Sequence, residues 1–164
     1  MAGVLCWIEG RAALPASARR LQDLSNKGTG GDDEAACELR EACLRGAPEP
    51  QEFARRWIAA WNARDLEAVL AMFAEDAVFT SPLALRLQPD GGGVVRGKQA
   101  LREYWQTALQ HAPDLHFELT GLYAGIDSLL IGFRTRQGVD RFEVLRFRGG
   151  LVAEGHGTFP LSAS

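Results

Sequence analysis

The stretch Arg-Phe-Glu-Val-Leu-Arg-Phe at residues 141–147 alternates as a half-buried strand does, and a Gly-Gly pair at 149–150 follows it as a turn. Alternate side chains of a strand share one face of a sheet. If the face of Arg141, Glu143 and Leu145 is the inner one, a carboxyl group and a guanidinium lie among leucine and aromatic side chains. A buried charge without a partner is costly, so this face predicts either a site for chemistry or a buried ion pair.

The overall composition is that of a soluble globular chain. Of the 164 residues, 46% are hydrophobic and 24% are charged, which is enough apolar content for a core. The net charge of -3 and the lack of a basic cluster argue against a nucleic-acid partner. No apolar run reaches membrane-spanning length, and the N-terminus lacks the basic region of a signal peptide. We therefore expect a cytoplasmic protein that binds neither nucleic acid nor membrane.

All three cysteines lie in the first part of the chain, at Cys6, Cys37 and Cys43. The main body therefore has neither a disulfide framework nor a catalytic thiol, and free thiols fit a reducing cytoplasm. A stretch rich in Gly, Ser and Asp between the first two cysteines has the composition of a flexible linker. We expect residues 1–47 to be a flexible N-terminal extension with one short helix, and residues 48–164 to be the folded domain.

The spacing of apolar residues predicts three helices ahead of a run of strands. The expected helices lie at about 51–62, after an N-cap at Asp65, and at about 98–111; the expected strands lie at 77–80, 115–120, 129–135, 140–148 and 151–159. The second helix would bury Phe73 in its apolar stripe, and Ser81 would end the first strand. Helices followed by consecutive hairpins predict an α+β domain with a curved antiparallel sheet and helices on one face.

The Gly149-Gly150 turn can be closed in two registers. A two-residue turn places Glu143 opposite His156, which would form an acid–base dyad. A three-residue turn places Glu143 opposite Gly155 and turns His156 outward. We prefer the three-residue turn, because a one-residue slip reverses every side chain and this register puts the small and apolar residues of the last strand inside, namely Leu151, Ala153, Gly155, Gly157 and Phe159.

The inward-facing residues predict an apolar cavity with one polar pair, which is the usual anatomy of a site for a small hydrophobic molecule. Glu143 is the candidate acid or base, and Arg141 either orients a ligand oxygen or neutralises Glu143 as a buried ion pair. The candidate ligand-binding side chains, which could equally be plain core, are Trp57, Phe73, Ser81, Trp105, Phe117, Ile131, Phe133 and Leu145. His111 and His116 have no partner at metal-ligand spacing and His116 is expected to face outward, so we expect no metal.

Four segments carry a resemblance to a known family. They are Phe-Ala-Arg-Arg-Trp with the following Trp-Asn-Ala-Arg-Asp-Leu-Glu-Ala at 53–68, the stretch at 73–82, Gly-Lys-Gln-Ala-Leu-Arg-Glu-Tyr-Trp at 97–105, and the closing hairpin at 142–154. Between about Pro48 and Phe159 the chain resembles the SnoaL-like branch of the nuclear transport factor two-like, or ketosteroid isomerase-like, superfamily. The resemblance implies a cone in which a curved antiparallel sheet wraps around three N-terminal helices and encloses an apolar pocket.

The same resemblance bears on chemistry. Ketosteroid isomerases carry an aspartate base, a hairpin acid and a tyrosine on the first helix, where this chain has Ser81, Glu143 and Trp57, so steroid isomerisation is not expected. SnoaL-type polyketide cyclases rely chiefly on the hairpin acid, a role that Glu143 would take. Limonene-epoxide hydrolases place an arginine two residues before an aspartate, and Arg141 and Glu143 are similar, but their third carboxylate has no clear counterpart.

These observations leave several functions open. One is a cofactor-independent lyase, cyclase or isomerase acting on a small carbonyl compound, with Glu143 shuttling a proton and Arg141 positioning oxygen. The alternatives are a non-catalytic ligand-binding or dimerisation module, an epoxide hydrolase-like enzyme, and a protein-interaction domain with a filled core. A homodimer through the outer sheet face is expected from its outward apolar residues, Leu130, Phe142, Val144 and Val152.

Overall fold

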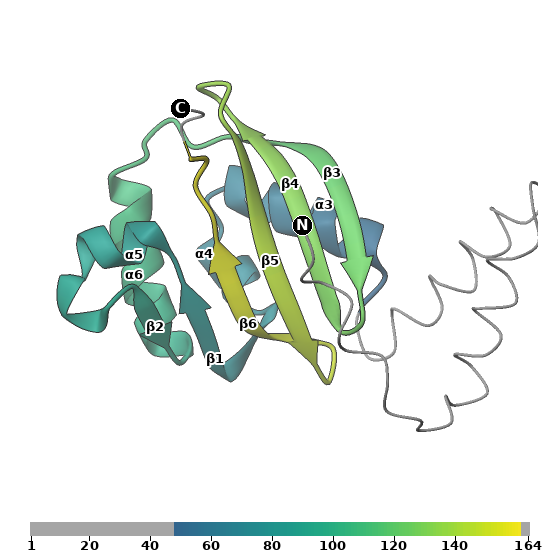
Figure 1. Ribbon diagram of the computed structural model, residues 1–164, viewed down its shortest axis with the longest axis horizontal. Helices are drawn as coiled ribbons and strands as arrows, with labels where there is room; N and C mark the ends of the chain where they lie inside the picture. Colours follow the sequence, from purple (N-terminus) through teal and green to yellow (C-terminus); the bar gives the residue numbers. More distant parts are fainter. Residues whose placement is uncertain (1–47, 162–164) are drawn as a thin grey trace, which may run out of the picture. The chain divides into compact units, whose positions relative to one another are not determined.

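The computed structural model describes residues 48–161 (Figure 1), so the predictions made for residues 1–47 lie outside the described part of the chain. The helices are α3 (Pro50–Asn62), α4 (Leu66–Leu70), α5 (Pro82–Leu87), the short 3-10 helix η1 (Pro89–Gly91) and α6 (Lys98–Gln110). The strands are β1 (Phe73–Thr80), β2 (Val94–Arg96), β3 (Phe117–Gly125), β4 (Ser128–Thr135), β5 (Asp140–Arg148) and β6 (Leu151–Gly157).

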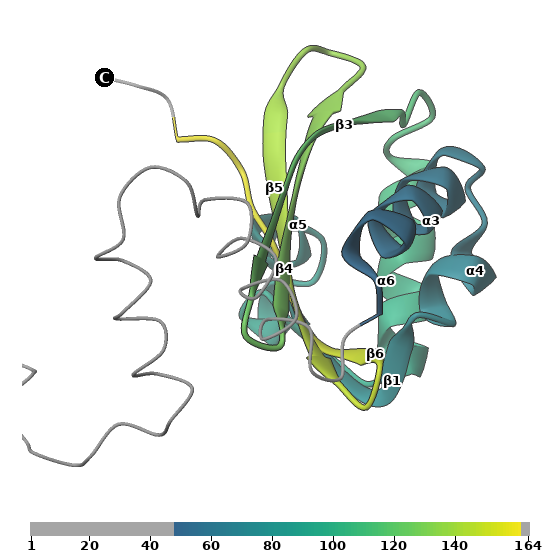
Figure 2. The same cartoon turned by 90° about the vertical axis from the view of Figure 1, so that its right-hand side faces the viewer.

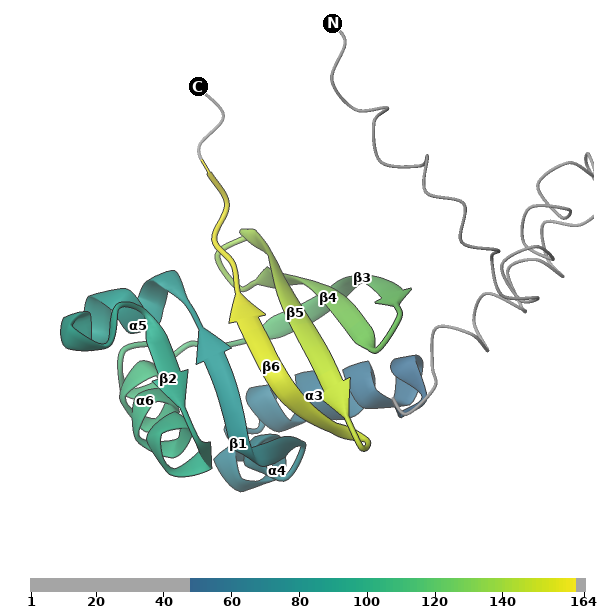
Figure 3. The ribbon, with the colours of Figure 1, turned by 60° about the horizontal axis from the view of Figure 1, so that its bottom comes forward.

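The strands form one curved sheet in the order β2-β1-β6-β5-β4-β3. Helices α3, α4 and α6 lie on one side of it (Figure 2), which confirms the α+β prediction. One pairing differs from the expected antiparallel sheet. β1 lies between β2 and β6 (Figure 3). It runs parallel to β6, because the chain forms β2, α6, β3, β4 and β5 before β6 is placed beside β1.

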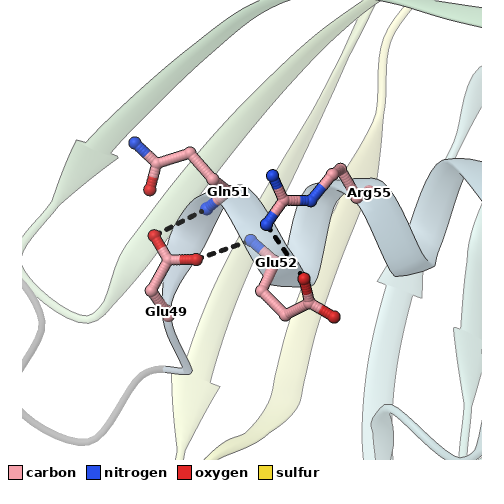
Figure 4. A network of polar contacts seen from close by, with 4 residues as sticks. All are labelled: Glu49, Gln51, Glu52 and Arg55. Atoms are coloured by element: carbon pink, nitrogen blue, oxygen red, sulfur yellow. Dashed lines mark hydrogen bonds and ion pairs between the residues drawn. The ribbon is translucent and has the colours of Figure 1, made fainter.

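The first helix begins where the sequence provides a cap. The carboxylate of Glu49 accepts hydrogen bonds from the backbone N–H groups of Gln51 and Glu52, at 3.1 and 2.7 Å (Figure 4). Pro50 occupies the first turn, where its missing N–H costs nothing. An exposed pair between Glu52 and Arg55 at 2.9 Å follows on the same face. α3 is therefore fixed at its start, and it buries its aromatic side against the sheet.

The end of α3 is tied to the start of β3. The side-chain amide of Asn62 donates to the carbonyl of Phe117 at 2.9 Å, and the N–H of Phe117 donates back to Asn62 at 2.7 Å. Arg64 has a positive φ of 57° and donates to the last carbonyls of α6 and its following loop, those of Leu109, Ala112 and Pro113. These contacts set the position of the loop that precedes β3.

One prediction about the middle of the chain was wrong. Phe73 does not belong to the second helix, which is a single short turn capped by Asp65; it begins β1, opposite Val152. The segment after Ser81 contains three elements that were not predicted from the sequence, α5, η1 and β2. The Ser81 hydroxyl accepts a hydrogen bond from the N–H of Leu83 at 3.1 Å, and proline in the first turn suits a helix as well as it ends a strand.

The closing hairpin has the two-residue turn at its tip, and beyond a bulge it takes a register that neither expected turn gives. Near the tip, Arg148 pairs with Leu151 as a two-residue turn requires, and a bulge between Arg146 and Phe147 then leaves Ala153 as one extra residue in β6. Glu143 consequently lies opposite Gly157, so the predicted pairing with Gly155 was wrong. The bulge restores the expected parity beyond it, where Gly155 and Gly157 face inward and His156 lies beside Val144 on the outer face.

The bulge also corrects the outer face. Val152 is completely buried, whereas Leu151 is exposed, the reverse of the prediction for this end of the strand. Phe142 is 42% exposed, and Leu130 and Val144 are partly buried. The apolar set proposed for a sheet-face homodimer therefore loses Val152, and the homodimer stays a prediction. No helix within residues 48–161 is long and apolar enough to cross a membrane.

Candidate functional site

A cavity of about 290 Å³ lies between the inner face of the sheet and helices α3 and α6. Its walls are mainly aromatic, from Trp57 and Trp61 on α3, Trp105 on α6, Phe79 on β1, Phe117 on β3 and Phe133 on β4. The rings are packed against one another: the Phe117 and Phe133 centroids are 4.3 Å apart, and Trp57 stacks on Phe117 at 6.0 Å. The walls are therefore held by the core itself.

Most of the residues expected to bind a ligand do line this cavity. They are Trp57, Ser81, Trp105, Phe117, Phe133, Arg141 and Glu143. Phe73, Ile131 and Leu145 do not; each is buried to 1% exposure or less in the surrounding core. Phe73 packs edge-on against Trp105 with centroids 5.0 Å apart, so it supports the wall from behind.

Glu143 is the buried acid of the cavity. It projects from the inner face of β5 and is only 7% exposed, and its carboxyl group takes part in none of the hydrogen bonds or ion pairs found within residues 48–161. Removal from water raises the pKa of Glu143 from 4.5 to about 8, with the positive charge of Arg141 opposing the rise. The carboxyl group is therefore mostly protonated at neutral pH.

The small residue opposite Glu143 brings three groups together. A Cβ atom built on Gly157 would lie 3.3 Å from the Ser81 hydroxyl oxygen, 3.4 Å from the Phe79 ring and 3.5 Å from a carboxyl oxygen of Glu143. The lack of a side chain at Gly157 therefore leaves the space in which Ser81 and Glu143 face the same point. Ser81 caps α5 and lines the cavity at once.

Tyr104 is a site residue that was not among the expected ligand-binding side chains. It lies on α6, lines the cavity and is 2% exposed. Burial raises the pKa of the Tyr104 hydroxyl, the Ser81 side chain opposes this, and the charges of Glu143 and Arg141 act on it in opposite directions. A tyrosine in a buried helical stripe needs a partner for its hydroxyl, which is the signal that would have identified it.

Arg141 lies at the same end of the cavity but does not pair with Glu143 as expected. Its Nε donates to the carbonyl of Thr158 at 2.9 Å, and its guanidinium carbon lies 3.8 Å from the centre of the Phe159 ring. None of the ion pairs within residues 48–161 includes Arg141. Of the two roles left open for Arg141, the buried ion pair with Glu143 is not formed, because residues after β6 contact the guanidinium instead.

The histidines divide between the two sides of the sheet. His156 lies on the outer face with its Nδ1 2.8 Å from the Thr80 hydroxyl, so it forms no dyad with Glu143. His111 and His116 are exposed, as expected for His116, yet both line the cavity at its rim with Asp114. No group of three or more His, Cys, Asp or Glu side chains in the described residues is arranged to hold a metal ion.

Comparison with known proteins places this site in a family. Residues 54–155 match the SnoaL-like domain. The solved structure of a SnoaL-like protein of unknown function from Burkholderia thailandensis is 36% identical, covers 69% of this chain and 100% of its own, and has a TM-score of 0.64. No curated protein matches the chain in sequence.

More distant structures share the fold. TerC, solved with polyporic acid, is 16% identical, with 68% of this chain and 92% of its own covered and a TM-score of 0.56. A putative polyketide cyclase from Sinorhizobium meliloti is 20% identical, with 65% and 94% covered and a TM-score of 0.53. Others are described as nuclear transport factor two-like and ketosteroid isomerase-like. The expected family is confirmed: this chain belongs to the SnoaL-like family.

Proposed function

We propose that the cavity binds a small hydrophobic molecule with a carbonyl group, and that Glu143 exchanges a proton with it as a cofactor-independent lyase, cyclase or isomerase does. The observation that carries this proposal is a carboxyl group in an aromatic cavity, with its pKa raised to about 8. A general acid or base works best when its pKa lies near the working pH. Glu143 meets that condition, whereas an exposed glutamate does not.

The two protonation states of Glu143 would have different tasks. At pH 7 about nine in ten molecules hold the proton, since the pKa is about 8. The protonated group donates a hydrogen bond to the ligand oxygen. The carboxylate form takes a proton from the carbon next to the carbonyl, the electrons of the C–H bond move toward the oxygen, and the proton is returned at another atom.

The charge that develops on oxygen during such a step needs donors. The Tyr104 hydroxyl and the Arg141 guanidinium both line the cavity with Glu143, near enough for both Arg141 and Glu143 to shift the pKa of Tyr104. Fixed donors in a site that excludes water stabilise an oxyanion more than water does. Hydrophobic aromatic walls hold the rest of the molecule. The polyporic acid co-crystallised with TerC and the putative polyketide cyclase described above are consistent with a ligand of this kind.

Proton exchange can be tested without knowing the substrate. Acetylnaphthalene is a flat ketone with exchangeable protons beside its carbonyl, and ethylnaphthalene matches its shape without the oxygen. We expect the protein to accelerate deuterium uptake by the ketone in heavy water, measured by NMR. The rate should rise with pH toward a midpoint near 8. Glu143→Gln should abolish the acceleration while leaving ketone affinity within a few fold, because an amide still donates a hydrogen bond.

A non-catalytic ligand-binding module is the second candidate. The observation that favours it is the single buried carboxyl group, since Glu143 is the one buried charged residue within residues 48–161. In that case the ketone binds more tightly than ethylnaphthalene in a thermal-shift titration, but no deuterium uptake is accelerated. Binding without exchange would remove the catalytic proposal, and equal binding of the two probes would remove both.

A further inference from the structure

Arg141 and Glu143 lie two residues apart on the inner face of β5, where long side chains of opposite charge can reach one another. Glu143 is buried and Arg141 is partly buried, which strengthens their attraction. Arg141 is nevertheless absent from the ion pairs of residues 48–161. Some other contact must therefore hold the guanidinium.

The segment after β6 supplies that contact. The carbonyl of Thr158 accepts a hydrogen bond from Arg141 Nε at 2.9 Å, and the Phe159 ring lies over the guanidinium at 3.8 Å, with Phe133 5.9 Å away on the cavity side. Thr158 is itself fixed to β5: its N–H and hydroxyl donate to the carbonyl of Phe142 at 3.1 and 2.7 Å, and the N–H of Phe142 donates to its hydroxyl at 3.1 Å.

We infer that Thr158 and Phe159 form a clamp that positions the Arg141 guanidinium away from the Glu143 carboxyl group, so that the cavity presents the two groups to a ligand separately. Phe159 is then a positioning residue, which acts through Arg141. The inference deepens the proposed function, since it concerns the same acid, but its test requires neither a ligand nor turnover.

The surroundings of Glu143 make the state of Arg141 decisive. The other titratable group facing the acid is Tyr104 on α6, while β1, β4 and β6 contribute Phe79, Phe133 and Gly157; the exposed rim adds His111, Asp114 and His116. Burial raises the pKa of Glu143, and Arg141 is the group that opposes the rise. If the clamp opens and Arg141 pairs with Glu143, that pKa falls.

Phe159 suits mutation because it is 40% exposed, so its removal leaves the core intact. The titration of Glu143 can be followed by NMR of glutamate labelled with carbon-13 at the carboxyl carbon, with Glu143→Gln identifying the signal. We expect the midpoint in Phe159→Ala to fall by about one pH unit or more, the effect of a new ion pair on a carboxyl group. Phe159→Tyr keeps a ring over the guanidinium and should keep the midpoint of the original protein.

The same substitution in a variant without Arg141 distinguishes release of the guanidinium from better hydration of Glu143. In Arg141→Met the midpoint should not fall, and adding Phe159→Ala should then change nothing, because the guanidinium that the ring positions is gone. An unchanged midpoint in Phe159→Ala would overturn the inference. So would an equal fall with and without Arg141, since that result means better hydration of Glu143. If the Glu143 midpoints behave as expected but the protein does not accelerate deuterium uptake by the ketone, the proposed function alone is contradicted.

Discussion

The buried acid should make the stability of this protein depend on pH in an unusual direction. In most proteins the fold stabilises the ionised form of the carboxyl groups, so the free energy of unfolding falls in acid. Glu143 is the opposite case, since burial raises its pKa from 4.5 to about 8 and the folded state holds the proton more tightly than the unfolded chain. Its contribution is therefore most favourable below pH 4.5, and it is lost as the pH rises from 4.5 to 8.

The magnitude follows from the two pKa values. A difference of one pKa unit corresponds to about 1.4 kcal/mol, so the difference between 4.5 and about 8 corresponds to about 5 kcal/mol over the full range. Within that range the free energy of unfolding should fall by about 1.4 kcal/mol per pH unit through this group alone. Glu143 is 7% exposed, so little screening by solvent reduces the effect.

Glu143→Gln isolates this contribution, because glutamine has nearly the same shape and does not titrate. The assay is urea unfolding of both proteins between pH 5 and 8. Between pH 5 and 8 we expect the free energy of unfolding of the variant to rise by about 3 kcal/mol relative to that of the original protein. The reason is that Glu143 of the original protein releases its proton in the unfolded chain but keeps it in the fold. Parallel curves for the two proteins would refute the reasoning, because they would mean that Glu143 is ionised in the fold at no cost.

Further substitutions test the geometry around the cavity. A methyl on Gly155 would meet Phe79 at 2.7 Å whereas one on Gly157 meets nothing closer than 3.3 Å, so Gly155→Ala should cost about 1 to 3 kcal/mol of stability in urea unfolding and Gly157→Ala should mainly weaken ketone binding; equal stability losses would contradict this. Tyr104→Phe should weaken ketone affinity by about 1 kcal/mol in a thermal-shift titration without slowing refolding, and unchanged affinity would show that the hydroxyl does not reach the ligand. Asn62→Ala removes both hydrogen bonds to the start of β3 and should lower the free energy of unfolding by about 2 kcal/mol, with Asn62→Asp losing less; a loss below about 0.5 kcal/mol would mean that the helix end is held by packing alone.

The closing hairpin shows how far its sequence could be interpreted. Alternation placed Gly155, Gly157 and Glu143 on the inner face, and the structure agrees. The route to that result was different. Two glycines allow either turn length, and the tip has the two-residue turn. A bulge of one residue then shifts the pairing, so Gly155 and Gly157 face inward as predicted although Glu143 lies opposite Gly157 and not Gly155. The bulge lies at Val152-Ala153-Glu154, a stretch with no glycine or proline that would mark it in the sequence.

The sequence predicts which side chains of one strand or helix face the site, but not the contacts between segments that are far apart in the sequence. Glu143, Trp57 and Trp105 follow from strand and helix periodicity. The clamp on Arg141 could not be foreseen, because nothing near residue 141 in the sequence indicates which residues the end of β6 brings alongside. Ser81 was expected to end a strand or to contact a ligand, and its role as the cap of α5 was not predicted, because the following proline fits a strand end as well as the first turn of a helix.

Binding and catalysis differ at Glu143 in one physical respect, the exchangeable proton. A glutamine at this position would offer a ligand oxygen the same kind of hydrogen bond, and it would avoid the loss of about 5 kcal/mol that the acid undergoes above pH 8. The contact of Arg141 with Phe159 rather than with Glu143 preserves that titration near neutral pH. A single buried carboxyl group is enough to hold a ligand, but a proton that exchanges near neutral pH adds nothing to holding it, and this argues for proton exchange over binding alone.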